Sequence, residues 1–355
     1  MEASWCMKIY VLTSYLSGYP SFSTTTALQS SNFQIAEFSN QLFLFLRFQS
    51  TSPTEQAGYK TVTMALLDGK HLAGIIKKEL AAAVVVLQAE GKRAPHLAAV
   101  LVGEDPASQA YVGNKVKSCA EVGFQSTLIR RPADVSQEEL LEIVASLNDN
   151  PEIDGFIVQL PLPKHIREDA ITLAIRPEKD VDGFHPVNFG RMAQGMPAFL
   201  PATPFGILEM LRRYEIPTSG KEVVVVGRSN IVGTPMSLLL SRKGYPGDAT
   251  VTLCHSRTKD IAAHTRRADI LIAAIGSPEF IKADMVKEGA VVIDVGINRV
   301  EDATAPRGYR LAGDVDFKNV EPLSSWITPV PGGVGQLTVI ALLINTLKAF
   351  KKEVF

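Results

Sequence analysis

Cysteine is scarce in this sequence, and the few cysteines present are not spaced for a metal site or a disulfide framework. Cys6, Cys119 and Cys254 are the three cysteines among 355 residues. Three scattered cysteines without a C-x-x-C pair argue against a disulfide-stabilised secreted fold and fit a reducing compartment. The six histidines contain no H-x-x-x-H pair. We therefore predict neither a structural nor a catalytic zinc site.

The sequence also lacks an excess of charge of one sign and a long apolar run. Its formal net charge of −1 gives no general attraction to nucleic acid or to an anionic membrane. The apolar run at residues 42–46 is much shorter than the roughly 20 residues that a membrane-spanning helix needs. With 46% hydrophobic and 21% charged residues, the composition is that of a globular protein long enough for two domains. We expect no nucleic-acid partner and no membrane partner.

Residues 1–63 differ from the rest of the chain, because they carry few charges and lack the alternation of strands and helices that begins near Ala65. A secretory signal is disfavoured by Glu2 and by the broken apolar run that follows it. A transit peptide would be rich in arginine, whereas this stretch has Arg47 alone and contains three glutamates. We interpret it as a disordered or non-native extension, with Met64 as the functional start.

Apolar strands and amphipathic helices alternate after this extension. Apolar runs predict strands at residues 97–102, 126–129 and 155–160, and helical spacing predicts helices at residues 72–90, 136–147 and from the loop after Gly103 to about Val122. Such alternation is typical of a parallel sheet, in which ligands bind at the carboxyl ends of the strands. The Gly103 loop and Gln159 should therefore lie at the same edge.

Tyr111 and Lys115 are four residues apart on one of these predicted helices. Their side chains should share one face, with Cβ atoms roughly 5–6 Å apart. A lysine that is shielded from water can act as an acid or base, because desolvation lowers the pKa of an ammonium group toward neutrality. The alternative is a solvated lysine beside a half-buried tyrosine, which this pair alone does not exclude.

Asp180 and Asp182 flank Val181 in a predicted turn or extended segment, so their side chains should point in opposite directions. At most one of them then faces a ligand, and the alternative is a turn with two solvated carboxylates. The proline-containing stretch up to Pro204 is typical of a domain junction. Residues 205–214 are predicted to form a linking helix that starts at this proline.

The second half contains a strand, a loop and a helix in an order that suits an anion. The β-branched run at residues 222–226 leads into Gly227, and Gly233 precedes a helical segment to about Lys243. Glycines between a buried strand and a helix N-terminus allow the backbone to approach a phosphate. The loop is not a G-x-G-x-x-G motif, because Arg228 occupies its interior with Ser229, so its place between strand and helix carries the prediction.

The next predicted strand, at residues 249–253, ends where dinucleotide-binding folds place an acidic residue that holds a ribose 2′-hydroxyl. Here the positions are Cys254, His255, Ser256 and Arg257, and none is a carboxylate. A hydroxyl and a guanidinium, with Arg228 across the crevice, suit a 2′-phosphate because arginine binds phosphate bidentately. This favours NADP over NAD, and solvated arginines at strand ends are the alternative.

Two further strands are predicted at residues 270–275 and 290–294. We interpret three aspartates near strand ends as structural rather than catalytic: Asp269, Asp294 and Asp314. A loop rich in proline and glycine at residues 328–335 precedes a predicted helix at residues 337–350. Because this helix follows the nucleotide-binding sheet, we expect it to pack back on the first domain.

Five motifs, in this order, resemble the bifunctional methylenetetrahydrofolate dehydrogenase/methenyltetrahydrofolate cyclohydrolase family of the FolD type. They are Tyr111 with Lys115, Val158-Gln159-Leu160-Pro161-Leu162, PEKDVDG at residues 177–183, Val226-Gly227-Arg228-Ser229, and PVPGGVG at residues 329–335. The resemblance extends from Met64 to the C-terminus. It implies a two-domain α/β fold, with a folate-binding domain at residues 64–201 completed by 336–355, and a Rossmann-like NADP-binding domain at residues 202–335.

The resemblance also implies a role for each site residue. Lys115 would be the catalytic group of the cyclohydrolase step, with Gln159 setting its protonation, and Tyr111 would pack on the aminobenzoyl part of folate. Asp182 would hold the pterin ring, and the folate cleft would be lined by the backbone around Val158, Leu160, Pro331 and Gly332. NADP would contact Gly227, Arg228, Ser229, Ser256 and Ile297.

A member of this family would oxidise 5,10-methylenetetrahydrofolate to 5,10-methenyltetrahydrofolate with NADP+ and hydrolyse the product to 10-formyltetrahydrofolate. It would be a cytoplasmic homodimer. One alternative is a monofunctional dehydrogenase, with either NADP or NAD, and another is a catalytically silent nucleotide-binding protein. The sequence departs from the family pattern at Gln336-Leu337, where relatives have Pro-Met, and the lost proline should loosen the adjacent loop.

Overall fold

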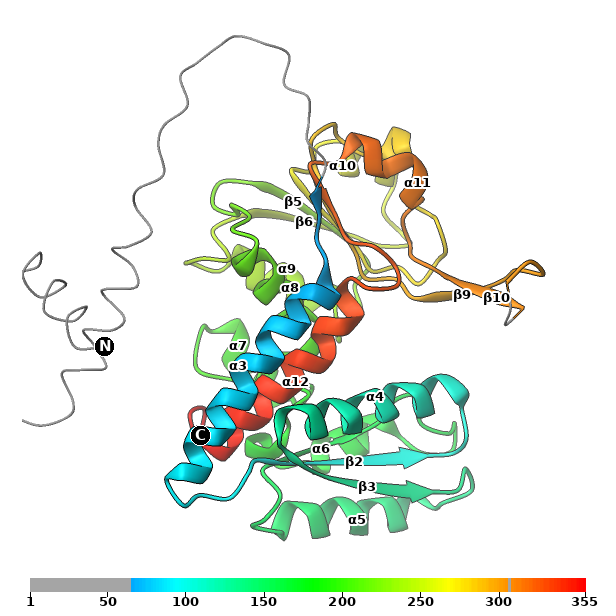
Figure 1. Cartoon of the computed structure of the whole chain (residues 1–355). Helices are drawn as coiled ribbons and strands as arrows, with labels where there is room; N and C mark the ends of the chain where they lie inside the picture. The colour runs from blue at the N-terminus through cyan, green and yellow to red at the C-terminus, as the bar shows by residue number, and fades with distance from the viewer. Residues whose placement is uncertain (1–64, 306–307) are drawn as a thin grey trace, which may run out of the picture. The chain divides into compact units, whose positions relative to one another are not determined.

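The computed structural model of the chain describes residues 65–305 and 308–355, in which strands and helices alternate (Figure 1). The extension predicted at residues 1–63, and Met64 itself, lie outside the described residues. Within the described ranges, no helix has both the length and the apolar character needed to cross a membrane.

A three-stranded parallel sheet with the order β3-β2-β4 forms the centre of the first half. Its elements in chain order are α3 (Gly69–Ala89), β2 (His96–Val102), α4 (Pro106–Val122), β3 (Gln125–Arg131), α5 (Gln137–Asp149), β4 (Gly155–Val158), α6 (Glu168–Ala174) and α7 (Pro186–Ala193). From Leu97 to Val102 every residue of the central strand β2 is buried, as its uninterrupted apolar sequence predicts. The predicted α/β fold and the parallel sheet are confirmed.

Two local predictions in this half need correction. Strand β4 ends at Val158, two residues before the predicted end, although the Gln159 N–H still donates to Val100 O at 2.9 Å. Pro161 follows two residues later and has no N–H with which to extend the ladder. Ser136 with Glu139 three residues later also predicts a capping box at the start of α5. Ser136 does cap this helix, but the Glu139 carboxylate binds Arg131 at 2.9 Å instead.

The second sheet has six parallel strands in the order β1-β11-β8-β7-β5-β6. Its strands and the helices between them are β1 (Ala65–Leu66), α8 (Ala202–Arg213), β5 (Glu222–Val226), α9 (Gly233–Ser241), β6 (Thr250–Cys254), α10 (Ile261–Thr265), β7 (Ile270–Ala273), β8 (Val291–Asp294), α11 (Phe317–Val320) and β11 (Trp326–Ile327). A separate antiparallel hairpin is formed by β9 (Asn298–Glu301) and β10 (Tyr309–Ala312). The first strand of this sheet therefore comes from the start of the described chain, which the sequence patterns do not predict.

The C-terminal helix α12 (Val334–Phe350) packs against α3, α8 and α4 and against the sheet strands β2 and β4 (Figure 1). This confirms that the C-terminal helix packs back on the first half of the chain. The helix begins three residues earlier than the prediction, and α8 likewise begins at Ala202, so that Pro204 lies within its first turn.

The departure from the family pattern lies in the first turn of α12. Leu337 is completely buried, whereas Gln336 is exposed. The Gln336 N–H donates to Gly333 O at 3.3 Å, a bond that a proline at this position could not make. This bond opposes the loosening that loss of the proline ring would otherwise cause.

Helices α8 and α12 approach each other closely at Gly206. A Cβ atom on this glycine would lie 2.8 Å from the backbone C and O atoms of Leu337 and 2.9 Å from its Cβ. Because backbone atoms cannot move aside as the end of a flexible side chain can, even one methyl group must separate the two helices.

We expect Gly206→Ala to lower the free energy of unfolding by about 1–3 kcal/mol, because it overpacks this helix contact. Gly74→Ala is the matched control, since Gly74 is exposed on α3 and a Cβ there would meet nothing within 4 Å. That control should raise the free energy of unfolding by about 0.8–1 kcal/mol through helix propensity. Urea denaturation of both variants measures the difference, and equal stabilities would contradict the proposed contact.

Candidate active site

Helix α4 places Tyr111 and Lys115 one turn apart. The helix begins because the Asp105 carboxylate accepts the Ser108 N–H at 2.7 Å and Pro106 follows at the first helical position, where its missing N–H does no harm. It ends at Gly123, which adopts a left-handed conformation with φ of 79°. The Lys115 Nζ atom lies 5.8 Å from the centre of the Tyr111 ring, as the sequence spacing predicts.

Lys115 is buried rather than solvated, with only 6% of its surface exposed. Its Nζ donates a hydrogen bond of 3.0 Å to Oε1 of Gln159, which directly follows β4. Gln159 in turn donates from Nε2 to Leu160 O at 2.6 Å, so its amide oxygen is held toward the lysine. The structure therefore brings together the two residues that the motifs pair, and the solvated-lysine alternative is wrong.

Burial lowers the pKa of the Lys115 amine from its ordinary value, and the negative charge of Asp182 opposes this shift. For Asp182, burial raises the pKa and the charge of Lys115 opposes it. Desolvation is the larger effect on both groups, because each loses water and gains only one opposite charge. A lysine with this lowered pKa can be a neutral base and an ammonium acid in the same cycle.

Asp180 and Asp182 lie in different surroundings, as the one-residue spacing predicts. The buried Asp180 carboxylate accepts hydrogen bonds from the backbone of Phe184 and His185 and from the side-chain amide of Asn188. All its partners are within the protein, so Asp180 fixes the turn. Both aspartates line a small pocket with residues of β4 and Leu160, but none of the described residues donates a hydrogen bond to the Asp182 carboxylate, which leaves it as the one available to a ligand.

The proline- and glycine-rich loop at residues 329–335 reaches the Tyr111 side chain. A Cβ atom on Gly335 would lie 3.0 Å from Ile297 Cδ1 and 3.7 Å from the Tyr111 hydroxyl oxygen. The loop is tied to the start of α3, where the Lys70 N–H donates to Gly332 O at 2.9 Å. The sequence motifs include Gly335 but do not predict this meeting point of the two halves.

Two glycines of the nucleotide loop are required by its backbone geometry. Gly227 has φ of 120°, and a Cβ there would lie 2.0 Å from Ala274 O. A Cβ on Gly233 would lie 1.8 Å from Gly227 O. The loop can fold this tightly between β5 and α9 only without side chains at these positions, which leaves backbone N–H groups for a phosphate.

The groups that would receive a 2′-phosphate are exposed. Ser256 and Arg257 lie in a turn that is closed by a hydrogen bond of 2.9 Å from the His255 N–H to Thr258 Oγ1. Arg228 is exposed as well, and among the described residues no acidic side chain pairs with it. Free guanidinium and hydroxyl groups, without a carboxylate, fit NADP better than NAD. Ser229 is partly engaged, because its Oγ accepts the Val232 N–H at 3.2 Å.

Comparison with known proteins agrees with this geometry. The family description "Tetrahydrofolate dehydrogenase/cyclohydrolase, catalytic domain" matches residues 67–182, and "Tetrahydrofolate dehydrogenase/cyclohydrolase, NAD(P)-binding domain" matches residues 201–354. The chain belongs to the tetrahydrofolate dehydrogenase/cyclohydrolase family. Membership makes it an enzyme that acts on tetrahydrofolate derivatives, so the catalytically silent alternative is not supported.

Several members of this family are highly similar to the chain. The bifunctional protein FolD of Flavobacterium johnsoniae is 62% identical over 288 residues, which cover 81% of this chain and 98% of that protein. The structure of the bifunctional enzyme FolD from Campylobacter jejuni is 46% identical, with a TM-score of 0.77, and covers 82% of this chain and 100% of that one. The Trypanosoma brucei FolD structure, a complex with NADP and an inhibitor, is 41% identical, with a TM-score of 0.78 and coverage of 82% and 98%.

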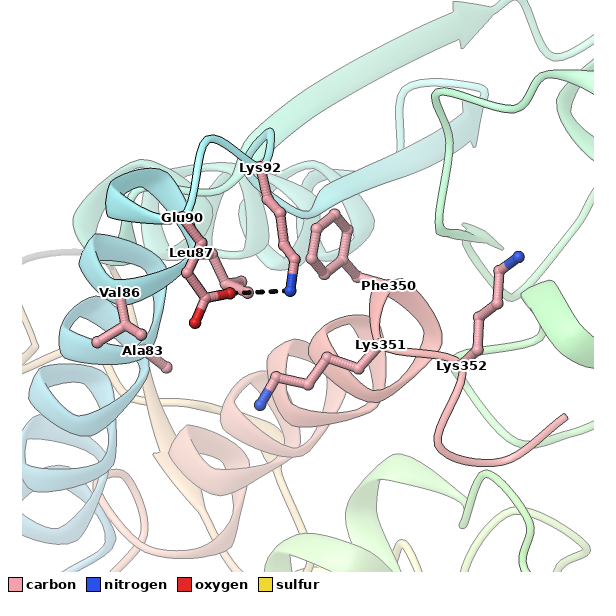
Figure 2. A pocket seen from close by; sticks show the side chains of 8 residues that line it. All are labelled: Ala83, Val86, Leu87, Glu90, Lys92, Phe350, Lys351 and Lys352. Carbon is pink, nitrogen blue, oxygen red and sulfur yellow. Dashed lines mark hydrogen bonds and ion pairs between the residues drawn. The ribbon is translucent and has the colours of Figure 1, made fainter. Parts of the chain in front are cut away.

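Another groove of this tetrahydrofolate dehydrogenase/cyclohydrolase lies away from these residues. Figure 2 shows it between the C-terminal ends of α3 and α12, where Glu90 and Lys92 form an ion pair of 2.8 Å beside Phe350. None of the predicted site residues lines it. Among the described residues, no group of three or more His, Cys, Asp or Glu side chains is arranged to hold a metal ion.

A substitution at Asp182 can separate the effects of burial and of charge on the pKa of Lys115. We expect Asp182→Asn to lower the pKa of the Lys115 amine further, because it removes the negative charge that favours the ammonium form. The pKa is measured from the pH dependence of the lysine ¹³Cε resonance. Glu178→Gln, an exposed carboxylate in the same motif, is the control and should leave this pKa unchanged. A higher pKa in Asp182→Asn would contradict the assignment.

Proposed function

We propose that one cleft, between α4, the end of β4 and the loop at residues 329–335, serves both reactions of this enzyme. The enzyme oxidises 5,10-methylenetetrahydrofolate to 5,10-methenyltetrahydrofolate with NADP+ and hydrolyses the product to 10-formyltetrahydrofolate. The observation that carries the proposal is the buried Lys115 amine, hydrogen-bonded to Gln159 at 3.0 Å and near Tyr111. A monofunctional dehydrogenase would have no need of a desolvated amine at this place.

In the hydrolysis step, Lys115 accepts a proton from the attacking water and later donates a proton to the substrate. Water adds to the methenyl carbon, and the neutral amine accepts the proton that the water loses. The resulting ammonium then donates a proton to N5 as the bond between carbon and N5 breaks, which leaves the formyl group on N10. One proton is released to solvent for each methenyl cation hydrolysed. Gln159 accepts a hydrogen bond from the amine and keeps it in place throughout.

In the oxidation step, the protein contributes positioning rather than an acid or base. When bound, NADP+ supplies the nicotinamide that accepts the hydride from the methylene bridge. We propose that Asp182 accepts hydrogen bonds from the pterin ring, that Tyr111 packs on the aminobenzoyl group, and that the rest of the folate lies on Val158, Leu160, Pro331 and Gly332. Correct placement of the two reacting carbons supplies most of the rate.

The NADP assignment uses residues of the second sheet. Gly227 and Ser229 would meet the phosphates, Arg228 and Ser256 the 2′-phosphate, and Ile297, which is 48% exposed, the nicotinamide half. The corresponding domain division is residues 64–201 with 336–355 for folate and residues 202–335 for NADP. Exposed apolar surface at Ile297 beside Gly335 supports the last assignment, because a flat ring can cover it.

We also propose a homodimer in the cytoplasm without a nucleic-acid or membrane partner. The net charge of −1 supports the lack of an anionic partner. The buried thiols of Cys119 and Cys254 are free, which is compatible with a reducing compartment.

Replacing Lys115 should separate the two activities. We expect Lys115→Met to reduce hydrolysis of methenyltetrahydrofolate by about 10²-fold or more, since the proton carrier is lost, while hydride transfer stays measurable. Lys117→Met is the matched control, because Lys117 is on the same helix with 76% of its side chain exposed. Both rates are followed by absorbance, of methenyltetrahydrofolate for hydrolysis and of NADPH for oxidation. Equal loss of the two activities in Lys115→Met would refute the division of roles.

Replacing Arg228 should change the choice of cofactor. We expect Arg228→Ala to raise KM for NADP by about ten- to a hundredfold, the effect of losing a charge-assisted pair, with little effect on KM for NAD. Arg130→Ala serves as the control, because Arg130 is also exposed but lies on β3, away from the nucleotide loop. The 2′-phosphate assignment fails if the ratio of the two KM values does not change.

A further inference from the structure

Two buried aspartates have no chemical part in either proposed reaction: Asp294, the last residue of β8, and Asp314, which follows β10 and whose carboxylate lies against the loop after β7. Their side chains are 3% and 0% exposed. They are neighbours, because the Asp314 N–H donates to Asp294 Oδ1 at 2.8 Å. Among the described residues no cation pairs with either, so backbone N–H groups are what compensate these buried carboxylates. Such an arrangement fixes the loops that supply the N–H groups.

The Asp314 carboxylate holds the loop that follows β7. It accepts hydrogen bonds from three consecutive backbone N–H groups, those of Ile275 at 2.6 Å, Gly276 at 2.9 Å and Ser277 at 2.9 Å. A fourth donor is the side-chain amide of Asn298, at 2.9 Å. Asn298 is the residue after Ile297, so one carboxylate joins the loop after β7 to the segment that carries Ile297.

The Asp294 carboxylate holds the loop that follows β8. It accepts the N–H groups of Gly296 at 3.0 Å, Asp314 at 2.8 Å and Val315 at 3.0 Å. Its own backbone N–H donates to Thr328 Oγ1 at 2.7 Å. Thr328 directly precedes the loop at residues 329–335. Asp294 therefore connects the segment before Ile297 with the start of the loop that reaches Tyr111.

Two glycines leave room for these carboxylates and for nothing larger. A Cβ atom on Gly296 would lie 2.3 Å from Asp314 Oδ1, and one on Gly313 would lie 1.8 Å from Asp294 Oδ2. This close packing is independent of the hydrogen bonds. It shows that the positions of the two carboxylates and of the loop backbone determine each other.

The loops held in this way contact both parts of the site. On one side, Ala274, the residue before the loop at 275–277, approaches the nucleotide loop so closely that Gly227 must lack a side chain. On the other side, Ile297 lies beside Gly335, where the Tyr111 hydroxyl also lies. A dinucleotide that extends from the Gly227 loop toward folate must pass over this backbone.

We propose that Asp294 and Asp314 are positioning residues that hold residues 275–277 and 296–298 in the conformation that receives the nicotinamide half of NADP. They act through the loop backbone and do not contact the reacting atoms. The inference rests on the cofactor assignment proposed above for Gly227 and Ile297, and its test distinguishes the two.

Asp314→Asn tests the inference. An asparagine side chain has only one acceptor oxygen, so its NH₂ group would face some of the N–H groups that Asp314 now binds. We expect the Kd of the full-length chain for NADPH, measured by fluorescence titration, to rise about tenfold or more. Hydrolysis of methenyltetrahydrofolate, assayed without nucleotide, should stay within about threefold, because residues 275–277 and Asn298, which Asp314 holds, supply none of the groups proposed for that step. A merely structural role would reduce both together.

Asp269→Asn is the matched control. Asp269 precedes the opposite end of β7, where it accepts the Glu222 N–H at 3.0 Å and pairs with Lys287 at 2.6 Å. Its replacement should leave the Kd for NADPH unchanged. Asn298→Ala is a milder second variant, which removes a single donor to Asp314 and decides the matter if Asp314→Asn does not fold.

The inference is overturned if Asp314→Asn or Asn298→Ala binds NADPH as the wild type does, or if each loses NADPH binding and hydrolysis to the same degree. Failure of the wild-type chain to bind NADPH is a different result. That outcome refutes the cofactor assignment itself.

Discussion

A lysine amine enclosed by protein, with one glutamine oxygen as its hydrogen-bond acceptor, is the constraint on which the site depends. Burying a charged ammonium is unfavourable, and the nearby Asp182 compensates only in part. The position of the amine must therefore be maintained by the rest of the fold. The cap at Asp105 sets the start of α4, and Val100 accepts the Gln159 N–H just beyond the end of β4. The energy that offsets this burial comes from the apolar core beneath it, including the fully apolar strand β2.

Three glycines around the site let the backbone come close to an oxygen atom of another segment. Gly227, Gly296 and Gly313 each lie so near a carbonyl or carboxylate oxygen that any side chain would collide with it. In each case the glycine directly follows or closely follows a strand and lets the chain there pack against a neighbouring segment. Hydrogen bonds then fix the loop, so that it need not lose much conformational freedom when a ligand binds.

Most of the fold and much of the site could be predicted from the sequence, because the relevant signals are local. Periodicity gives the strands and helices, and the helical spacing of Tyr111 and Lys115 gives their shared face. Contacts between distant segments could not be derived in this way. Nothing around Asp314 in the sequence indicates that its carboxylate binds residues 275–277, since an aspartate after a glycine is also typical of a turn. The early end of β4 and the pairing of Glu139 with Arg131 likewise depend on tertiary neighbours.

Two reactions in one cleft place opposite demands on the protein. Hydride transfer requires the nicotinamide to lie against the folate, whereas hydrolysis requires a water molecule and the Lys115 amine to reach the same carbon. Gly335 lies between Ile297, which we assign to the cofactor side, and Tyr111 on the helix that carries the lysine. This arrangement is compatible with both requirements, because the two reactants can approach the folate from different sides. If the loops held by Asp294 and Asp314 receive the nicotinamide half of NADP as proposed, they would keep the nicotinamide on the second-sheet side of the folate. In the proposed mechanism the Lys115 amine then reaches the attacking water from the opposite side, where its lowered pKa favours the neutral form that accepts a proton.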